Sequence, residues 1–146
     1  MPVERSAGII LFKETPRGRR YLLLRSSRED KGKPEFWDFS KGVLKNKELG
    51  IEAASREVGE ETGISDAEII PDFKETVRYF VRREGKSIPK FVAMFLGKIK
   101  NGEIKLSWEH NKFEWLSFKE AHSKLSVKPM KEALSKAEEF LNKIGK

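Results

Sequence analysis

Hydrophobic residues in the first third of the chain fall into short runs of strand length. Residues 6–13 and 21–25 are apolar, and the stretch between them, 15–18, contains a proline and a glycine. This pattern predicts a β-hairpin. The polar stretch 26–35 predicts a loop, and the short apolar run 36–39 predicts a third strand that ends at the following Lys-Gly pair.

The hydrophobic period changes in the middle of the chain. Over residues 49–62 the apolar side chains of Ile51, Ala54 and Val58 fall at i, i+3 and i+7. That spacing places them on one side of an α-helix, and Gly63 follows as the expected stop.

Residues 73–84 and 88–100 are rich in β-branched and aromatic side chains. They predict a long hairpin that turns at 84–87. Pro89 has no backbone N–H to donate, so we expect it at a strand start or at an edge.

The last third of the chain predicts one more strand over 113–116, a short helix over 117–124 with Ser117 as its cap, and a C-terminal helix that opens at Pro129. Apolar residues of the C-terminal helix recur at helical spacing, so its apolar face should pack on the sheet. The expected fold class is α/β of the α+β type, a mixed β-sheet sandwiched between helices, in a single domain spanning 1–146.

Composition narrows the classes of function. The chain has 146 residues, 38% of them hydrophobic, and 30 Lys and Arg against 23 Asp and Glu give a net charge of +7. An anionic partner is therefore expected. The absence of cysteine excludes disulfides and thiolate chemistry. No apolar stretch reaches the ~20 residues that cross a bilayer, and the first residues lack the hydrophobic centre of a signal peptide, so we expect a cytoplasmic protein without a membrane partner.

Three carboxylates crowd the end of the helix predicted over 49–62. Glu57 and Glu61 project one turn apart on the same side, and Glu60 lies about 60° to one flank. Like charges at this spacing repel each other, and anions in the last helical turn oppose the helix dipole. A divalent cation reverses both effects, and carboxylate oxygens suit Mg²⁺ or Mn²⁺. A solvated acidic face has the same spacing, so spacing alone leaves both interpretations open.

Neighbouring residues favour a positioned site over a solvated face. Gly42 can offer a bare backbone carbonyl at a strand end, Glu48 leads into the helix, and Arg56 can brace carboxylates through bidentate bonds.

Residues 42–64 resemble the 23-residue signature of the Nudix hydrolases, Gly-x5-Glu-x7-Arg-Glu-hydrophobic-x-Glu-Glu-x-Gly-hydrophobic. The matching positions are Gly42, Glu48, Arg56, Glu57, Val58, Glu60, Glu61, Gly63 and Ile64. Within that family the chain is most similar to the asymmetrical diadenosine tetraphosphate hydrolases. Tyr79 resembles their adenine-stacking tyrosine, Lys90 a phosphate-contacting lysine, and 107–110 their Ser-x-Glu-His segment. Ser40 departs from the pattern, because the relatives usually have proline there.

The resemblance implies a Mg²⁺-dependent hydrolase of nucleoside polyphosphates that cleaves diadenosine tetraphosphate to ATP and AMP. It implies a metal bound by Gly42, Glu57, Glu60 and Glu61. It implies Glu60 or Glu109 as the base, with Arg56 orienting the carboxylates. It implies a substrate site formed by Lys41, Tyr79, Lys90 and His110, with Phe91 as another aromatic that could stack on adenine.

Each residue outside the signature also has a structural interpretation. Tyr79 could be an ordinary strand aromatic, Lys41 and Lys90 solvated lysines, Glu109 a surface carboxylate and His110 a structural histidine. Competing functions are a pyrophosphohydrolase of RNA 5′-triphosphate ends, which the net charge of +7 would also attract, another hydrolase of nucleoside-diphosphate derivatives, or a non-catalytic nucleotide-binding or nucleic-acid-binding module. The intact set of glutamates argues against the non-catalytic module. The sequence does not indicate an oligomeric state.

Overall fold

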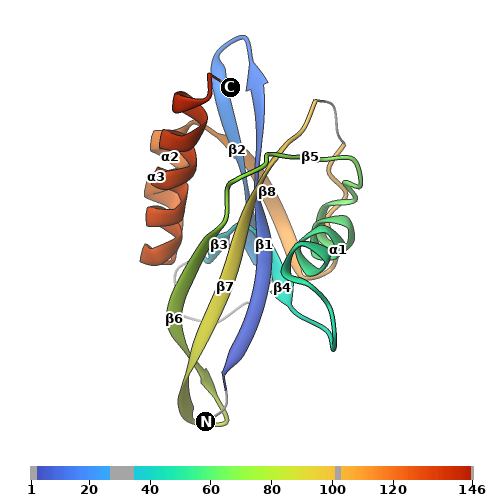
Figure 1. Cartoon of the computed structure of the whole chain (residues 1–146), viewed down its shortest axis with the longest axis vertical. Coiled ribbons are helices and arrows are strands. Elements are labelled where there is room, and N and C mark those ends of the chain that lie inside the picture. The colour runs from blue at the N-terminus through green and yellow to red at the C-terminus, as the bar shows by residue number, and fades with distance from the viewer. Residues whose placement is uncertain (1–2, 27–34, 101–102, 146) are drawn as a thin grey trace.

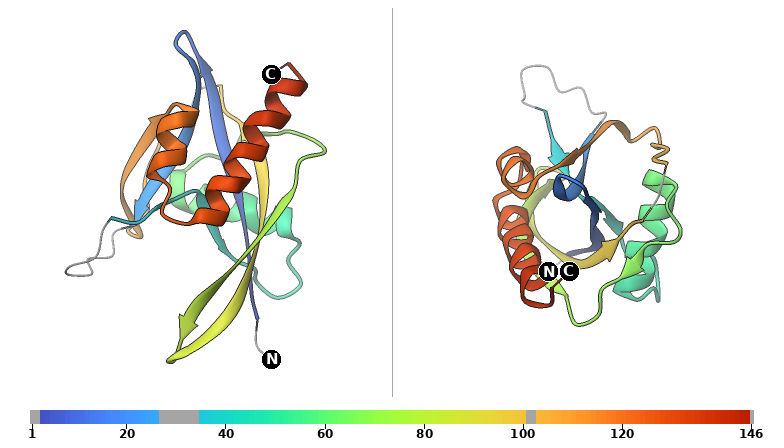
Figure 2. Two further views of the ribbon diagram at one scale, coloured as in Figure 1. Left: turned by 90° about the vertical axis from the view of Figure 1, so that its left-hand side faces the viewer. Right: turned by 90° about the horizontal axis from the view of Figure 1, so that it is seen from above.

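The computed structural model describes residues 3–26, 35–100 and 103–145. In this part of the chain a mixed β-sheet lies between helices, as the sequence predicts. Helix α1 (Gly50–Thr62) packs against one face, and helices α2 (Phe118–Lys124) and α3 (Lys128–Lys143) pack against the other (Figures 1 and 2). None of these helices is long and apolar enough to cross a membrane.

Strands β1 (Glu4–Thr15) and β2 (Gly18–Ser26) form the predicted hairpin, with Thr15 paired directly to Gly18. β1 is central to the sheet. It pairs in antiparallel register with β2 and β4, and in parallel register with β7.

The third predicted strand, 36–39, is wrong in its extent, because the chain forms two short strands there. β3 (Trp37–Asp38) pairs with β2, and β4 (Ser40–Val43) pairs with β1. Between them the Asp38 Oδ1 accepts a 2.7 Å hydrogen bond from the backbone N–H of Phe39. The chain changes partner at this point, which hydrophobic periodicity cannot indicate. Most of the predicted loop before it, 27–34, lies outside the described residues.

Strands β6 (Glu75–Arg83) and β7 (Lys86–Lys98) form the predicted long hairpin. Its turn is shorter than expected and contains only Glu84 and Gly85, both with positive φ. Such a pair is typical of the tight turn that matches strand twist. Pairing of β7 with β1 begins at Lys90, so Pro89 lies where β7 has only β6 as a described partner, in agreement with the prediction.

Of the two remaining strands, one is longer than predicted and the other was not predicted. β8 (His110–Leu116) pairs with β2 and starts three residues earlier than the apolar run 113–116. β5 (Glu68–Ile69) pairs with β7 and was not predicted, because a two-residue strand carries no periodic signal.

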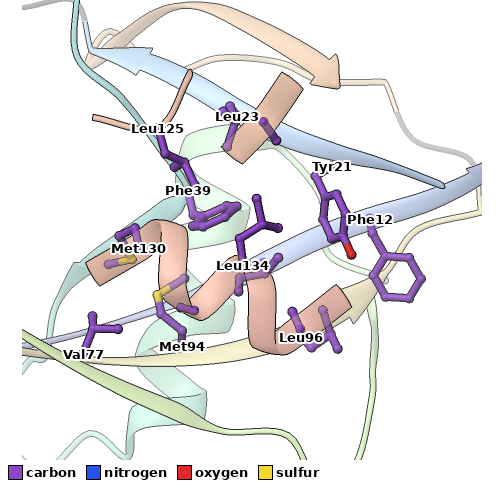
Figure 3. Packing of buried hydrophobic residues seen from close by; sticks show 14 of the residues in the cluster. Phe12, Tyr21, Leu23, Phe39, Val77, Met94, Leu96, Leu125, Met130 and Leu134 are labelled. Atoms are coloured by element: carbon purple, nitrogen blue, oxygen red, sulfur yellow. The ribbon is translucent and has the colours of Figure 1, made fainter. Parts of the chain in front are cut away.

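The sheet separates two hydrophobic cores. On one face Val92, Met94 and Leu96 of β7 pack with α2 and α3, whose buried residues include Leu134 (Figure 3). On the other face the intervening Ala93 packs with α1. Side chains of successive residues in β7 thus point to opposite faces of the sheet. The same alternation decides which face each site residue on β6 and β7 occupies.

Candidate active site

Strand β4 holds the Glu61 side chain at the end of α1. The Ser40 hydroxyl donates a 2.6 Å hydrogen bond to Glu61 Oε1, and the Lys41 backbone N–H donates one of 3.0 Å to the same oxygen. Glu61 is 3% exposed and Ser40 is 2% exposed. These bonds leave Oε2 without a hydrogen bond from β4.

Gly42 allows the Glu57 carboxylate to lie against β4. A Cβ atom at residue 42 would be only 2.0 Å from Glu57 Cδ and 2.2 Å from Oε1. Any other residue would have to displace this carboxylate. The glycine of the signature is therefore needed for this close approach of helix and strand.

Arg56 connects the loop after β4 to the helix. Its guanidinium donates to both carboxylate oxygens of Glu48, at 2.8 and 3.1 Å, and to the Val43 carbonyl at 3.1 Å. It also donates to Glu57 at 2.8 Å and to Glu60 at 3.2 Å. The bidentate bond lowers the pKa of the Glu48 carboxyl to about 2. Arg56 therefore contacts three carboxylates of the signature, those of Glu48, Glu57 and Glu60.

The surroundings of Glu57 and Glu61 disfavour the charged form of both carboxyls. Burial raises the pKa of Glu61 to about 8, and the nearby charges of Glu57 and Glu109 add to the effect, against the bonds from β4. Burial also raises the pKa of Glu57, and Arg56 opposes it. The site is therefore short of positive charge.

Two exposed carboxylates, those of Glu60 and Glu109, flank Glu57 and Glu61. The Glu60 side chain is 53% exposed and contacts Arg56. Glu109 is exposed, and its charge acts on both Glu57 and Glu61. His110 Nδ1 lies 3.7 Å from Glu61 Oε2 and has no hydrogen-bond partner among the described residues. Burial lowers the pKa of His110, so the imidazole is neutral at pH 7.

The expected substrate-binding residues continue along the α3 side of the sheet. Tyr79 pairs with Lys90 across β6 and β7, and the Lys90 Nζ lies 6.0 Å from the centre of the Tyr79 ring. Burial opposes the charge of Lys41, but Asp38, whose Oδ2 is 3.2 Å from its Nζ, and Tyr79 outweigh burial and raise the lysine pKa.

A second, largely buried ion pair joins Lys90 to Glu4. Lys90 Nζ lies 3.1 Å from Glu4 Oε1. Burial lowers the pKa of Lys90, and the positive charge of Lys41 lowers it further. The two lysines are therefore close enough to repel each other, which favours an anion between them.

Phe91 does not join this group, contrary to expectation. It pairs with Arg78 and Arg5, whereas its neighbour Lys90 pairs with Tyr79 and Glu4. Adjacent strand residues point to opposite faces, so Phe91 faces the α1 side and cannot stack on the same base as Tyr79.

Sequence reasoning missed Asp38 and Glu4 as members of the site and gave Ser40 only as a departure from the family pattern. Asp38 carried a usable signal, since a carboxylate inside the apolar run 36–39 needs a buried cation. Glu4 carried none, because its contact with Lys90 depends on the parallel register of β1 and β7.

The donor set fits a hard divalent cation. Among the residues that the structure describes, no three His, Asp or Glu side chains already stand in an arrangement that could hold a metal ion. The carboxyls of partly buried Glu57 and buried Glu61 nevertheless repel each other, and their oxygen atoms are ligands that hard cations prefer. A cation there would relieve the repulsion.

Comparison with known proteins agrees with this geometry. The model of the NUDIX domain family matches residues 2–137. The chain is 34% identical to the asymmetrical bis(5′-nucleosyl)-tetraphosphatase of Mus musculus, over 94% of this chain and 95% of that protein. It is 31% identical to the mRNA-decapping protein g5R of African swine fever virus, over 65% of this chain and 44% of that protein.

A solved structure of a C. elegans Ap4A hydrolase binary complex superposes with a TM-score of 0.83 at 30% identity, covering 95% of this chain and 98% of that one. Fold, signature and relatives agree: the chain belongs to the Nudix hydrolases, a family of divalent-metal-dependent enzymes.

Proposed function

We propose that this protein is a Mg²⁺-dependent hydrolase that cleaves diadenosine tetraphosphate to ATP and AMP. The proposal rests on one observation. The α1 carboxylates lie next to β4, whose Lys41 is followed by Tyr79 on β6 and Lys90 on β7. An acidic metal site next to one buried lysine, one partly buried lysine and an aromatic ring matches a substrate that joins phosphates to a base. The relative from Mus musculus, similar over almost its whole length, has a name that states the same substrate class.

In this proposal Glu57, Glu60, Glu61 and the Gly42 carbonyl hold the metal. When bound, Mg²⁺ supplies charge neutralisation for phosphate oxygens and a water of lowered pKa. Mn²⁺ has similar ligand preferences and could substitute. Arg56 bonds both Glu57 and Glu60 and so restricts the orientation of these two carboxylates.

Lys41 and Lys90 bind the phosphate chain, and Tyr79 stacks on adenine. His110, neutral and partly buried beside Glu61, donates a hydrogen bond to a phosphate oxygen. Glu60 or Glu109 accepts the proton of the attacking water, because these two carboxylates are exposed at the site and remain free of hydrogen bonds from β4.

A second candidate substrate is the 5′-triphosphate end of RNA. The identity with a viral mRNA-decapping protein and the net charge of +7 favour it. The non-catalytic module has less support, since a site without turnover would not need the mutually repelling carboxylates of α1. A single domain over 1–146 and a cytoplasmic location remain predictions.

The test is a turnover screen in Mg²⁺ over diadenosine tetraphosphate, nucleoside triphosphates, ADP-ribose and triphosphorylated RNA, with products separated by chromatography. We expect the highest kcat/KM for the dinucleotide, with ATP and AMP in equal amounts. Two ADP from the dinucleotide, or a preference for RNA ends, would contradict the proposed substrate or cleavage.

Glu61→Gln tests the metal assignment. It removes an anionic ligand without removing apolar surface, so turnover should fall by orders of magnitude in a folded protein. Glu132→Gln, an exposed change on α3 with the same loss of charge, should leave turnover unchanged. Equal rates for the two variants in saturating Mg²⁺ would refute the metal site.

A further inference from the structure

The α1-facing side of the β6–β7 hairpin carries an unusual series of cations over aromatic rings. Arg5 lies 5.2 Å from the centre of the Phe91 ring, Arg78 lies 5.9 Å from that of Phe80, and Lys74 lies 6.0 Å from that of Phe95. We call these six residues the Arg–Phe stripe. It follows β7 from the projecting end of the hairpin, visible in Figures 1 and 2, toward the start of α1.

Strand register separates the stripe from the proposed active site. Arg78, Phe91 and Arg5 are direct neighbours across β6, β7 and β1. The adjacent row of the same strands, Tyr79, Lys90 and Glu4, points to the α3 side. The stripe is therefore a second surface, not an extension of the substrate site.

The arginines of the stripe lack carboxylate partners. Within the described part of the chain, neither Arg5 nor Arg78 has an ion pair, and both are exposed. Arg83 of the same hairpin points to the other face and is held by Glu4 at 2.9 Å. Glu75, the one acidic residue of β6 and β7, also faces away, since it bonds to Lys136 of α3.

Both kinds of side chain in the stripe are accessible to a ligand. The Phe80 side chain is 61% exposed. At the other end Phe95 and Lys74 border a shallow, mostly apolar hollow of about 400 Å³, which Asp72 also lines. Exposed aromatic faces stabilise stacked bases, and exposed arginines bind phosphates or stack on bases through their planes.

We propose that the Arg–Phe stripe binds single-stranded nucleic acid. A single strand matches the stripe because each ring centre has a cation within 6.0 Å, and each nucleotide of a single strand joins a phosphate to an accessible base. A double helix hides its base faces, and an acidic peptide has no flat rings to stack. Neither alternative would use both components of the stripe.

The experiment measures binding of a fluorescent 15-nucleotide single strand with a 5′-hydroxyl end, in EDTA, by anisotropy at several salt concentrations. This probe has no polyphosphate, so it does not test the proposed hydrolysis, and the two proposals can fail independently. We expect saturable binding, with log K falling linearly with log salt.

Two variants test the two components. Arg78→Ala should reduce the salt slope by about 0.7, the value for one lost contact to a single-strand phosphate. Phe80→Ala should weaken binding by about tenfold through lost stacking, with little change in slope. Both residues are exposed and lie outside the proposed active site, so melting temperature and dinucleotide hydrolysis should not change.

Two control variants remove a positive charge and an aromatic ring from positions outside the Arg–Phe stripe. Lys86→Ala removes an exposed positive charge from the same hairpin, and Phe113→Ala removes a partly exposed ring from β8. Both should bind like the wild type. The proposal is overturned if no binding occurs at 50 mM salt, if the controls lose as much affinity, or if a duplex of equal length or polyglutamate binds as tightly.

Discussion

Gly42 decides how closely the Glu57 carboxylate approaches β4, because no side-chain atom separates the two. We predict that Gly42→Ala lowers kcat by about 100-fold, since a displacement of about 1 Å in a catalytic group has an effect of this size. Steady-state hydrolysis of the preferred dinucleotide would measure it.

Gly59→Ala provides the matched control within α1. A Cβ there meets its nearest atom at 3.8 Å, an ordinary contact. Alanine in a helix interior should stabilise the protein by about 0.5–1 kcal/mol and leave kcat unchanged. If both alanine variants kept full activity, the close approach of Glu57 to Gly42 would have no catalytic role.

Glu61 should make stability depend on pH when no metal is bound. Its pKa is about 8 in the folded protein and 4.5 as a model value, so between these pH values the folded state holds a proton that the unfolded state has released. The contribution of Glu61 to the free energy of unfolding therefore falls as pH rises through this window, by at most about 1.4 kcal/mol per pH unit.

Urea unfolding in EDTA, for the wild type and Glu61→Gln, isolates this contribution. Glutamine cannot ionise, so the wild type should lose stability relative to the variant from pH 5 to pH 8. The comparison is needed because neutral His110 has the opposite effect, with stability that rises as pH increases toward 6.5. A difference between the two proteins that does not change with pH would show that Glu61 titrates normally.

At the scale of elements, α2 begins with a complete capping box. The Ser117 hydroxyl accepts a hydrogen bond from the Glu120 N–H at 3.2 Å, and the Glu120 carboxylate accepts one from the Ser117 N–H at 3.1 Å. We predict that Ser117→Ala destabilises the protein by about 1 kcal/mol. Ser123→Ala in the same helix should change stability by less than about 0.5 kcal/mol, and urea midpoints would compare them.

Elements with a clear hydrophobic period were predictable from sequence, and those without one were not. The stop of α1 at Gly63 follows from its left-handed conformation, φ 78°. The division of 36–43 between β3 and β4 depends instead on which neighbouring strand each residue meets. That information lies in β1 and β2, far from the segment itself.

At the scale of the whole molecule, the site also divides into a part that one local segment predicts and a part that depends on distant strands. Its acidic part was predictable because Arg56, Glu57 and Glu61 lie within one turn or so of a single helix. The contact of Lys90 with Glu4 was not, since it requires the parallel register of β1 and β7. The expected position of Phe91 was wrong for that reason.

The projecting end of the β6–β7 hairpin, combined with a sequence that has no cysteine, makes this protein convenient for spectroscopy. Lys86 is exposed beside the turn, away from the carboxylates of α1. Lys86→Cys would therefore introduce the sole thiol of the chain. A maleimide dye should attach there once per molecule without loss of turnover, and its emission would report in real time on ligands that reach the hairpin.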